Sequence, residues 1–443
     1  MKKTVVLHTL GCKLNYSETS AITKKFVMNG FSVGKFGEQS DVFFLNSCTV
    51  TSHSDKECRK IIRSVLRKNP GTYVIVAGCY SQLKADEISQ IRGVDLILGT
   101  SEKFDFFKFF KYNDNKEIII EKFNEPVIKI SALENETRIF EAFSSDSDSR
   151  TRAFLKIQDG CDYNCAYCTV PLARGRSRSI KTEKVIRNAE EIISYGYKEI
   201  VLTGVNVADY YDNEKNFGFF NLLSELNKLE IPRIRISSIE PDLLNTDIIL
   251  LIKNSDKFCK HFHIPLQSGD DEILNKMKRK YKAENFRNLI LEIKNKIPDA
   301  CIGIDVITGF PGESDKNFEN TYEFLNELPF DYLHVFTYSA RDNTPAALMQ
   351  NKINEAAKKQ RSSMLRNLSV RKKQLFYDSC VGKVKEVLFE SKKQDSYFYG
   401  LTSNYIKVRT QPEHGSDSVL ENEIKKVILL KSNGIKFIES KLI

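Results

Sequence analysis

Three cysteines, Cys161, Cys165 and Cys168, lie within eight positions of one another. A loop this tight does not suit pairwise disulfides, but it lets three thiolates face one small inorganic centre. The spacing of these cysteines, called here the loop triad, favours an iron-sulfur cluster. A four-iron cluster held by three cysteines has one iron without a protein ligand, and an open metal position is a place for chemistry.

Two other interpretations of the loop triad stay open. Its last two cysteines could be half of a zinc site, but zinc takes four ligands and the loop has no fourth cysteine or histidine nearby. The same pair could be a redox motif, which would leave Cys161 without a role.

Three further cysteines, Cys12, Cys48 and Cys79, each follow a predicted strand of the N-terminal region. Ligands gather outside the carboxyl ends of the strands of an open α/β sheet, so these three should meet at one edge. One such cysteine could simply be a small buried residue. Three at equivalent positions, called here the strand-end triad, favour a second cluster, whereas we expect Cys58 to be structural.

The strand-end triad belongs to a region, residues 1 to about 111, in which short apolar runs alternate with helical stretches. This pattern predicts a small doubly wound α/β domain with a parallel sheet. The predicted strands are Val5–Leu10, Val42–Asn46, Tyr73–Ala77 and Asp95–Leu98. The predicted helices are Ser17–Asn29, Ser52–Lys68, Leu83–Ile91 and Ser101–Lys111.

A polar run, Ser144–Ser149, marks a domain boundary, and six apolar strands alternate with helices beyond it. They predict an incomplete (β/α) barrel with its functional groups on the loops at the carboxyl ends of the strands. The strands are Phe154–Ile157, Glu199–Leu202, Arg233–Ser237, His261–Leu266, Gly303–Ile307 and Tyr332–Thr337. The loops after them carry the loop triad, Thr203–Asn206, Ser238–Pro241, Gln267–Gly269 and Gly309–Glu313.

Several of these loop residues have a plain interpretation as well. Gly204 and the turn Gly309–Gly312 could serve chain geometry alone. Glu240 and Gln267 suit a barrel top better than an apolar interior. We expect His261 and His263, which alternate on one strand, to be structural rather than ligands.

The last part of the chain, residues 381–443, alternates apolar and polar residues between turn signals, which predicts a small five-stranded barrel. Its predicted strands are Val384–Phe389, Tyr397–Leu401, Tyr405–Thr410, Lys426–Leu430 and Ile435–Leu442. Tyrosines interleaved with cations suit an RNA-contacting surface, because aromatic rings stack on bases and cations hold phosphates. An inert structural cap is the alternative.

Composition and charge limit the class of protein. The chain of 443 residues exceeds the ~250 to 300 at which single cores stop growing, so several domains are expected. No apolar run approaches the ~18 residues of a membrane span, and the start offers no signal-peptide cleavage site, so we expect a cytoplasmic protein. Ten cysteines in a reducing compartment favour metal binding or catalysis over disulfides.

The net charge of +9 is unevenly distributed. Residues 150–187 hold nine Lys and Arg against three Asp and Glu, and residues 350–375 hold eight against one. Such stripes suggest a polyanionic partner, although a solvated helix face explains the second one equally well. The predicted helix Ser52–Lys68 is also basic and is a candidate phosphate contact.

Over nearly its whole length the chain resembles the methylthiotransferases of the radical S-adenosylmethionine (SAM) superfamily. The resemblance rests on Thr9–Asn15, Asn46–Thr51, Ala77–Tyr80 and the cluster loop, which continues through Pro171–Ser179. These strings are similar to the branch that acts on N6-threonylcarbamoyladenosine beside the tRNA anticodon. Leu14 stands where valine is usual and Leu172 where tyrosine is frequent, and neither is at a ligand position.

The resemblance implies an α/β fold in three parts. A flavodoxin-like doubly wound parallel sheet with an auxiliary cluster would span residues 1–125, and residues 126–150 would be a linker. A radical-SAM partial (β/α) barrel of six repeats would span residues 151–375. An RNA-binding β-barrel of the TRAM type would span residues 376–443.

The resemblance also implies an enzyme with two 4Fe-4S clusters and SAM as cofactors. At the loop triad, an electron would cleave SAM to a 5′-deoxyadenosyl radical. At the strand-end triad, the auxiliary cluster would hold the sulfur of the methylthio group that replaces hydrogen at the adenine C-2. The residues that would contact SAM are Tyr167, Thr203, Gly204, Asn206, Gly309, Pro311 and Gly312. The residues that would contact substrate are Glu240, Arg174, Arg176, Arg178, Tyr405 and Lys407.

The expected partner is a tRNA anticodon stem-loop, and the chemistry needs an electron donor and a sulfur source from outside the chain. We expect a monomer without membrane association. Within the family, isopentenyladenosine in tRNA or a ribosomal-protein aspartate would be the alternative substrate. A non-catalytic iron-sulfur RNA-binding protein and a zinc-binding RNA module are alternatives of other classes.

Overall fold

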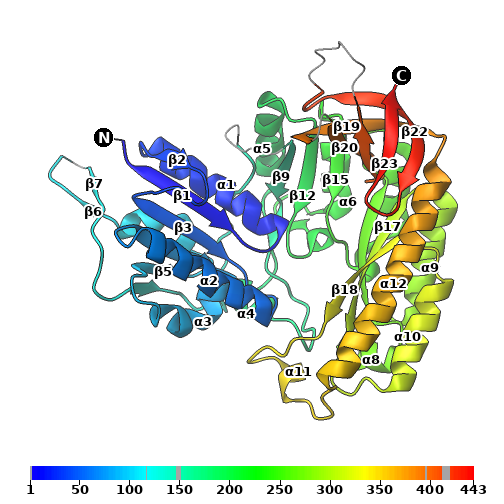
Figure 1. Ribbon diagram of the computed structural model, residues 1–443, viewed down its shortest axis with the longest axis horizontal. Coiled ribbons are helices and arrows are strands. Elements are labelled where there is room, and N and C mark those ends of the chain that lie inside the picture. The colour runs from blue at the N-terminus through cyan, green and yellow to red at the C-terminus, as the bar shows by residue number, and fades with distance from the viewer. Residues whose placement is uncertain (1, 116, 146–150, 395–396, 412–419) are drawn as a thin grey trace.

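The computed structural model describes residues 2–115, 117–145, 151–394, 397–411 and 420–443, in three parts that follow one another along the chain (Figure 1). The polar run predicted as a boundary therefore lies largely outside the described residues. Within the described ranges, no helix combines the length and the apolar character needed to cross a bilayer.

The N-terminal part is a parallel sheet in the order β2-β1-β3-β4-β5-β8. Its strands are β1 Thr4–Thr9, β2 Ser32–Gly34, β3 Val42–Ser47, β4 Tyr73–Gly78, β5 Leu96–Leu98 and β8 Val127–Lys129. Helix α1 (Lys13–Met28) packs on one face, and α2 (Ser52–Lys68) and α3 (Cys79–Ser89) pack on the other. The central strands are buried on both faces, which explains their continuous apolar runs.

Two predictions for this part differ from the structure. Strand β8 extends the sheet beyond the expected boundary at residue 125. The predicted helix at 101–111 is instead two 3-10 turns, η1 Glu102–Phe104 and η2 Phe106–Phe109. Phe106 and Phe107 both pack on Phe26, with ring centroids 4.6 and 5.3 Å away, whereas adjacent residues of an α-helix face different directions. A short hairpin of β6 (Lys111–Tyr112) and β7 (Ile118–Ile119) follows.

The central part is the predicted six-stranded partial barrel. Its strands are β9 Arg152–Lys156, β12 Glu199–Thr203, β15 Arg233–Ile236, β16 His261–Gln267, β17 Cys301–Thr308 and β18 Tyr332–Thr337. They form two parallel three-stranded sheets. Two isolated bridges, Ser238–His263 and Ile234–Phe258, join the sheets near β15 and β16. One apolar core fills the space between these strands and the helices outside them.

The helices of the central part are α5 Thr182–Ser194, α6 Phe219–Leu226, α7 Thr246–Asn254, α8 Asp271–Lys276, α9 Ala283–Lys296, α10 Asp315–Glu327 and α12 Glu355–Cys380. Its remaining elements are α4 Val170–Arg174, α11 Pro345–Leu348, β10 Gln158–Asp159, β11 Arg178–Ser179, β13 Tyr211–Asp212, β14 Phe217–Gly218, η3 Val207–Asp209 and η4 Pro241–Leu243. Helix α12 runs through the boundary expected at residue 376, because its last turn still packs on the partial barrel and on the barrel that follows.

The C-terminal part is a closed barrel in the order β19-β20-β21-β23-β22. Its strands are β19 Val384–Gln394, β20 Tyr397–Thr402, β21 Lys407–Thr410, β22 Ile424–Asn433 and β23 Phe437–Leu442. Arg233, at the start of β15, donates to the carbonyls of Leu401 and Glu386, each at 2.8 Å. The small barrel therefore sits on the amino-terminal end of the partial barrel, and the predicted fold class is confirmed.

Candidate active site between the two cysteine triads

The strand-end triad gathers at the carboxyl edge of the N-terminal sheet. Cys12 lies between β1 and α1, Cys48 follows β3, and Cys79 begins α3 after β4. A Cβ on Gly11, whose φ is +101°, would lie 2.8 Å from the Cys48 Sγ, so the chain needs glycine to pass this close. Burial, together with the nearby Cys79 and Cys12, raises the pKa of Cys48 to about 12. A bound cationic centre would remove this penalty.

The loop triad lies in the loop that follows β9 and β10. A Cβ on Gly160 would lie 1.9 Å from the Arg176 carbonyl oxygen, so only glycine fits where this loop begins. The backbone N–H of Tyr163 points at the Cys161 Sγ, and that of Val170 at the Cys168 Sγ, each at 3.4 Å. These donors stabilise negative charge on the sulfurs, although burial still raises the pKa of Cys168 to about 12.

Arg279 supplies a full positive charge beside the loop triad. Its guanidinium donates to the Cys165 Sγ at 3.1 Å and forms an ion pair with Glu240. The Arg279 side chain is only 2% exposed, so both interactions are largely shielded from solvent. Sequence reasoning proposed Glu240 as a substrate contact but missed Arg279, which has no spacing signal relative to the cysteines.

The spacing of the sulfurs argues against a single metal ion at either triad. Among the described residues, no three cysteine sulfurs lie within 4.8 Å of one another. A tetrahedral zinc ion with bonds of about 2.3 Å would hold its sulfurs about 3.8 Å apart. The three sulfurs of each triad therefore do not all lie as close together as a single zinc ion would hold them.

The loop after β12 presents buried polar atoms without partners. The Thr203 Oγ1 and both side-chain polar atoms of Asn206 make no hydrogen bond within the described residues. Buried polar atoms are nearly always paired, so these three atoms suit a polar ligand. The side chain of Gln158 accepts from the Val205 and Asn206 N–H groups at 2.9 Å and donates to the Gly160 carbonyl at 2.7 Å. Gln158 thereby holds this loop against the cluster loop.

Hydrogen bonds that involve Glu313 and Arg361 support the Gly309–Gly312 turn. The Gly309 N–H donates to Glu313 at 2.8 Å, and Arg361 of α12 donates to the same carboxylate oxygen at 2.7 Å. Gly309 and Gly312 both have positive φ, at +74° and +79°. Between them, Phe310 packs edge-on against Tyr167 at 6.4 Å, which brings the turn up to the cluster loop.

A cavity of about 240 Å³ lies between the cluster loop and the segment that follows Cys48. The N-terminal part lines it with Thr51, three residues after Cys48, and the cluster loop lines it with Tyr167 and Cys168. Asp305 and Phe336 line it from inside the partial barrel. A substrate in this space would meet groups from both cysteine sites.

Two predicted substrate contacts occupy other positions. Arg174 is 3% exposed and donates at 2.6 to 3.0 Å to Asn15, Glu18 and Asp159, so it joins the N-terminal part to the partial barrel. The Tyr405 hydroxyl donates to Glu199 at the base of the partial barrel. Both side chains are committed to contacts between parts of the chain and offer no free group to RNA.

The other predicted contacts remain accessible. Arg176 is exposed and borders a surface hollow of about 490 Å³ beside Cys161. Arg178 is half-buried and donates to backbone carbonyls, and Lys407 is exposed with its ammonium over the Tyr399 ring at 5.2 Å.

The basic face of α2 forms a further hollow of about 450 Å³ near the strand-end triad. The residues that line it are Lys56, Arg59, Lys60, Arg63 and Arg67, called here the α2 patch.

Comparisons with known proteins agree with this architecture. The profile of the radical SAM superfamily matches residues 155–325, and that of the uncharacterized protein family UPF0004 matches residues 4–99. The chain is 38% identical to the threonylcarbamoyladenosine tRNA methylthiotransferase MtaB of Bacillus subtilis, over 97% of this chain and 94% of that protein. The chain belongs to the radical SAM methylthiotransferase family. It is therefore an enzyme of this type, as predicted.

Other members of the family carry related names. MtaB of Aquifex aeolicus is 35% identical over 92% of this chain and 96% of its own length. The tRNA-2-methylthio-N6-dimethylallyladenosine synthase of Clostridium perfringens is 33% identical over 91% of this chain and 90% of its own length. Among solved structures, the radical SAM methyltransferase TsrM of Kitasatospora setae has a TM-score of 0.52 at 12% identity, covering 99% of this chain and 87% of that one. That likeness concerns the fold alone.

Proposed function

We propose that this enzyme methylthiolates the C-2 carbon of N6-threonylcarbamoyladenosine next to the tRNA anticodon, giving 2-methylthio-N6-threonylcarbamoyladenosine. The observation that carries the proposal is the cavity that Cys168 and the segment after Cys48 line together, since the reaction needs one substrate atom within reach of both triads. The names and identities of the relatives support the choice of nucleoside. A C–H bond of an aromatic ring resists acid–base chemistry, which supports a radical route.

The two cysteine triads and the loop after β12 suit two 4Fe-4S clusters and SAM. The loop triad would hold one cluster, the strand-end triad the other, and Thr203 and Asn206 would bind the polar groups of SAM. Bound together, SAM and the cluster supply one-electron chemistry that no side chain provides. The chain's own residues position these groups: Gln158 holds the SAM loop, and Arg279 balances the charge of Cys165.

Gln158→Leu is expected to weaken SAM binding about tenfold or more. The variant leaves the Val205 and Asn206 N–H groups without an acceptor, and each unpaired buried donor costs about 1–3 kcal/mol. Equilibrium binding of SAM to the anaerobic holoenzyme measures the effect. Gln374→Leu, on α12 beside Ser432 of the C-terminal barrel and away from the SAM loop, is the control. Equal SAM affinity in the two variants would contradict the role of Gln158.

Mass spectrometry of tRNA nucleosides from cells with and without the gene tests the function directly. Loss of 2-methylthio-N6-threonylcarbamoyladenosine alone, with a rise of its unthiolated precursor, is the expected result. Loss of the methylthiolated dimethylallyl nucleoside instead would move the enzyme to the other tRNA branch. The same tRNA nucleosides in both kinds of cell would contradict the proposal.

The double variant Lys60→Glu and Arg63→Glu in the α2 patch is expected to weaken tRNA binding. The logarithm of affinity falls with that of salt by about 0.7 to 0.9 per phosphate contact, so losing two contacts should flatten the slope by about 1.4 to 1.8. Filter binding between low and high salt measures it. Lys316→Glu, an exposed α10 lysine, is the control and should keep the wild-type slope. An unchanged slope in the double variant would exclude the patch from the RNA interface.

A further inference from the structure

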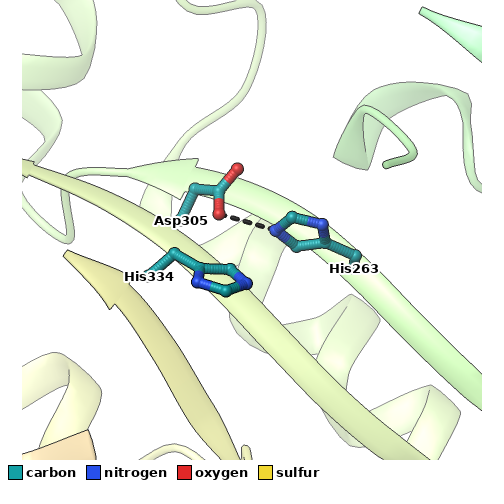
Figure 2. A group of neighbouring side chains, drawn as sticks. All are labelled: His263, Asp305 and His334. Atoms are coloured by element: carbon teal, nitrogen blue, oxygen red, sulfur yellow. Dashed lines mark hydrogen bonds and ion pairs between the residues drawn. The ribbon is translucent and has the colours of Figure 1, made fainter. Parts of the chain in front are cut away.

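The interior of the partial barrel carries polar side chains in layers below the cavity. Alternate residues of β16, β17 and β18 face inward, while their neighbours pack into the outer apolar core. His263, Asp305 and His334 come from three adjacent strands and point toward one another (Figure 2). Since Asp305 also lines the cavity, this layer, called here the His-Asp layer, borders it.

The His-Asp layer is tightly arranged. One atom from each side chain lies within 4.8 Å of the others, and the His263 Nε2 and the Asp305 Oδ1 are 2.6 Å apart. The His263 and His334 rings meet edge-on at 5.1 Å. His334 is exposed to the barrel interior, so a ligand can reach the layer.

A second layer lies beneath it. The His261 ring connects Arg235, at 3.3 Å from its Nδ1, to Tyr332, at 2.8 Å from its Nε2. The Arg235 guanidinium stacks on the Tyr405 ring at 4.0 Å, and its Nε is buried without a hydrogen-bond partner in the described part of the chain. Arg235 therefore has donor capacity that the protein does not use.

The charges around both layers decide between a metal ion and an anion. The Lys13 ammonium, at the start of α1, acts electrostatically on Arg235, Asp305, His261 and His334. Burial, aided by these cations, lowers the pKa values of His261 and His334, which leaves both rings neutral near pH 7. Within the two layers, Asp305 supplies one carboxylate and Arg235 a cation, and Lys13 acts on both, which favours an anionic ligand with hydroxyl or amide groups over a divalent metal.

We propose that the His-Asp layer and Arg235 form the subsite for the N6 substituent of the adenosine, with Arg235 and Lys13 attracting its carboxylate. The inference rests on the proposed function and deepens it. In adenine, C-2 and C-6 are separated by one ring nitrogen, so a base that turns C-2 toward the triads directs its N6 arm away from them. The threonylcarbamoyl arm would then enter the barrel and place its carboxylate near Arg235. Its hydroxyl and carbamoyl groups match the neutral imidazole of His334 and the Asp305 carboxylate.

The test compares two anticodon stem-loops on the holoenzyme. One carries N6-threonylcarbamoyladenosine, and the other carries its threoninamide analogue, which has nearly the same size but no charge. The wild type should methylthiolate the acid with a kcat/KM at least about tenfold above the amide, because a hydrogen bond to a charged group is worth more than one to a neutral group. Arg235→Gln should reduce that ratio, whereas His334→Leu should lower kcat/KM on both RNAs and leave their ratio nearly unchanged.

The ratio is internal to each variant, so it survives a loss of overall activity, and the wild-type ratio itself still tests the subsite if the buried Arg235→Gln variant does not fold. Equal rates of the wild type on acid and amide would overturn the subsite and leave the function intact. Conversion of neither RNA, with dimethylallyladenosine accepted instead, would overturn both. One metal ion per chain beyond the cluster irons, lost in His334→Leu, would overturn the subsite in favour of a metal site.

Discussion

Cys165→Ala is expected to abolish SAM cleavage by the holoenzyme, whereas Cys48→Ala should abolish methylthio transfer and leave SAM cleavage. The two cysteines belong to triads on different parts of the chain, so the loss of one cluster need not remove the other. When several residues act as one unit, removing any one of them abolishes nearly all of the activity that they support. We therefore expect the affected activity of each variant to fall at least about a thousandfold. Each variant should also contain about four fewer irons per chain.

Iron analysis, 5′-deoxyadenosine release and methylthionucleoside formation measure these effects separately. Cys380→Ala is the matched control, because this cysteine is 1% exposed in the last turn of α12, among residues of the C-terminal barrel core. It should keep the full iron content and both activities. Equal loss of SAM cleavage in the Cys48 and Cys165 variants would contradict the division of labour between the triads.

Glu18→Leu is expected to lower the free energy of unfolding by about 3–5 kcal/mol. The Glu18 carboxylate is fully buried between the N-terminal part and the partial barrel, with Lys103 at 2.6 Å, Arg174 at 3.0 Å and Lys156 at 3.1 Å. Its removal leaves three buried cations facing only Asp159. Breaking a buried charge network from one side leaves such charges uncompensated, which is strongly destabilising.

Denaturant unfolding of the holoenzyme measures the loss, and the same interface supplies a control. Lys24 of α1 and Glu191 of α5 form an ion pair at 2.6 Å with side chains 41% and 34% exposed. Lys24→Ala should therefore cost only about 0–1 kcal/mol. A similar small cost for Glu18→Leu would mean that the network contributes little to holding the two parts together.

Glu18 also ties this stability to pH. Burial alone would raise its pKa, but Arg174, Lys103 and Lys156 outweigh burial and hold it well below the usual value. A carboxyl with a lowered pKa in the folded state stabilises above its unfolded pKa of about 4.3 and loses this contribution as the pH falls further. The difference in stability between wild type and Glu18→Leu should therefore be full at pH 6 and shrink below about pH 4.

The sequence predicted what local patterns determine. Cysteine spacing and strand alternation placed both triads correctly at strand ends, and the six-stranded partial barrel and the five-stranded closed barrel were confirmed. Long-range partnerships were not predictable in this way. Arg174 lies in a basic stripe that suggested RNA, yet its carboxylate partner Glu18 is 156 positions away. Tyr405 was grouped with exposed tyrosines by alternation, but the docking of the small barrel half-buries it and stacks it on Arg235.

The roles in SAM and substrate binding that the sequence assigned to individual residues remain predictions. Gln158 and Arg279 act through contacts that only the folded chain creates: Arg279 reaches Cys165 across 114 positions. Single residues of common type carry no spacing signal, so such positioning groups appear only when the loops are seen together.

The C-terminal barrel covers the partial barrel at its amino-terminal end. Arg233, Tyr405 and Asn404 lock the small barrel over the amino-terminal mouth, through Leu401, Glu199 and Asp299 respectively. A nucleotide that enters at the opposite end therefore meets the small barrel at the amino-terminal end. If substrate and product tRNA use the same opening, a bound product tRNA excludes the next substrate. Release of the product RNA is then a step that can limit the rate of turnover.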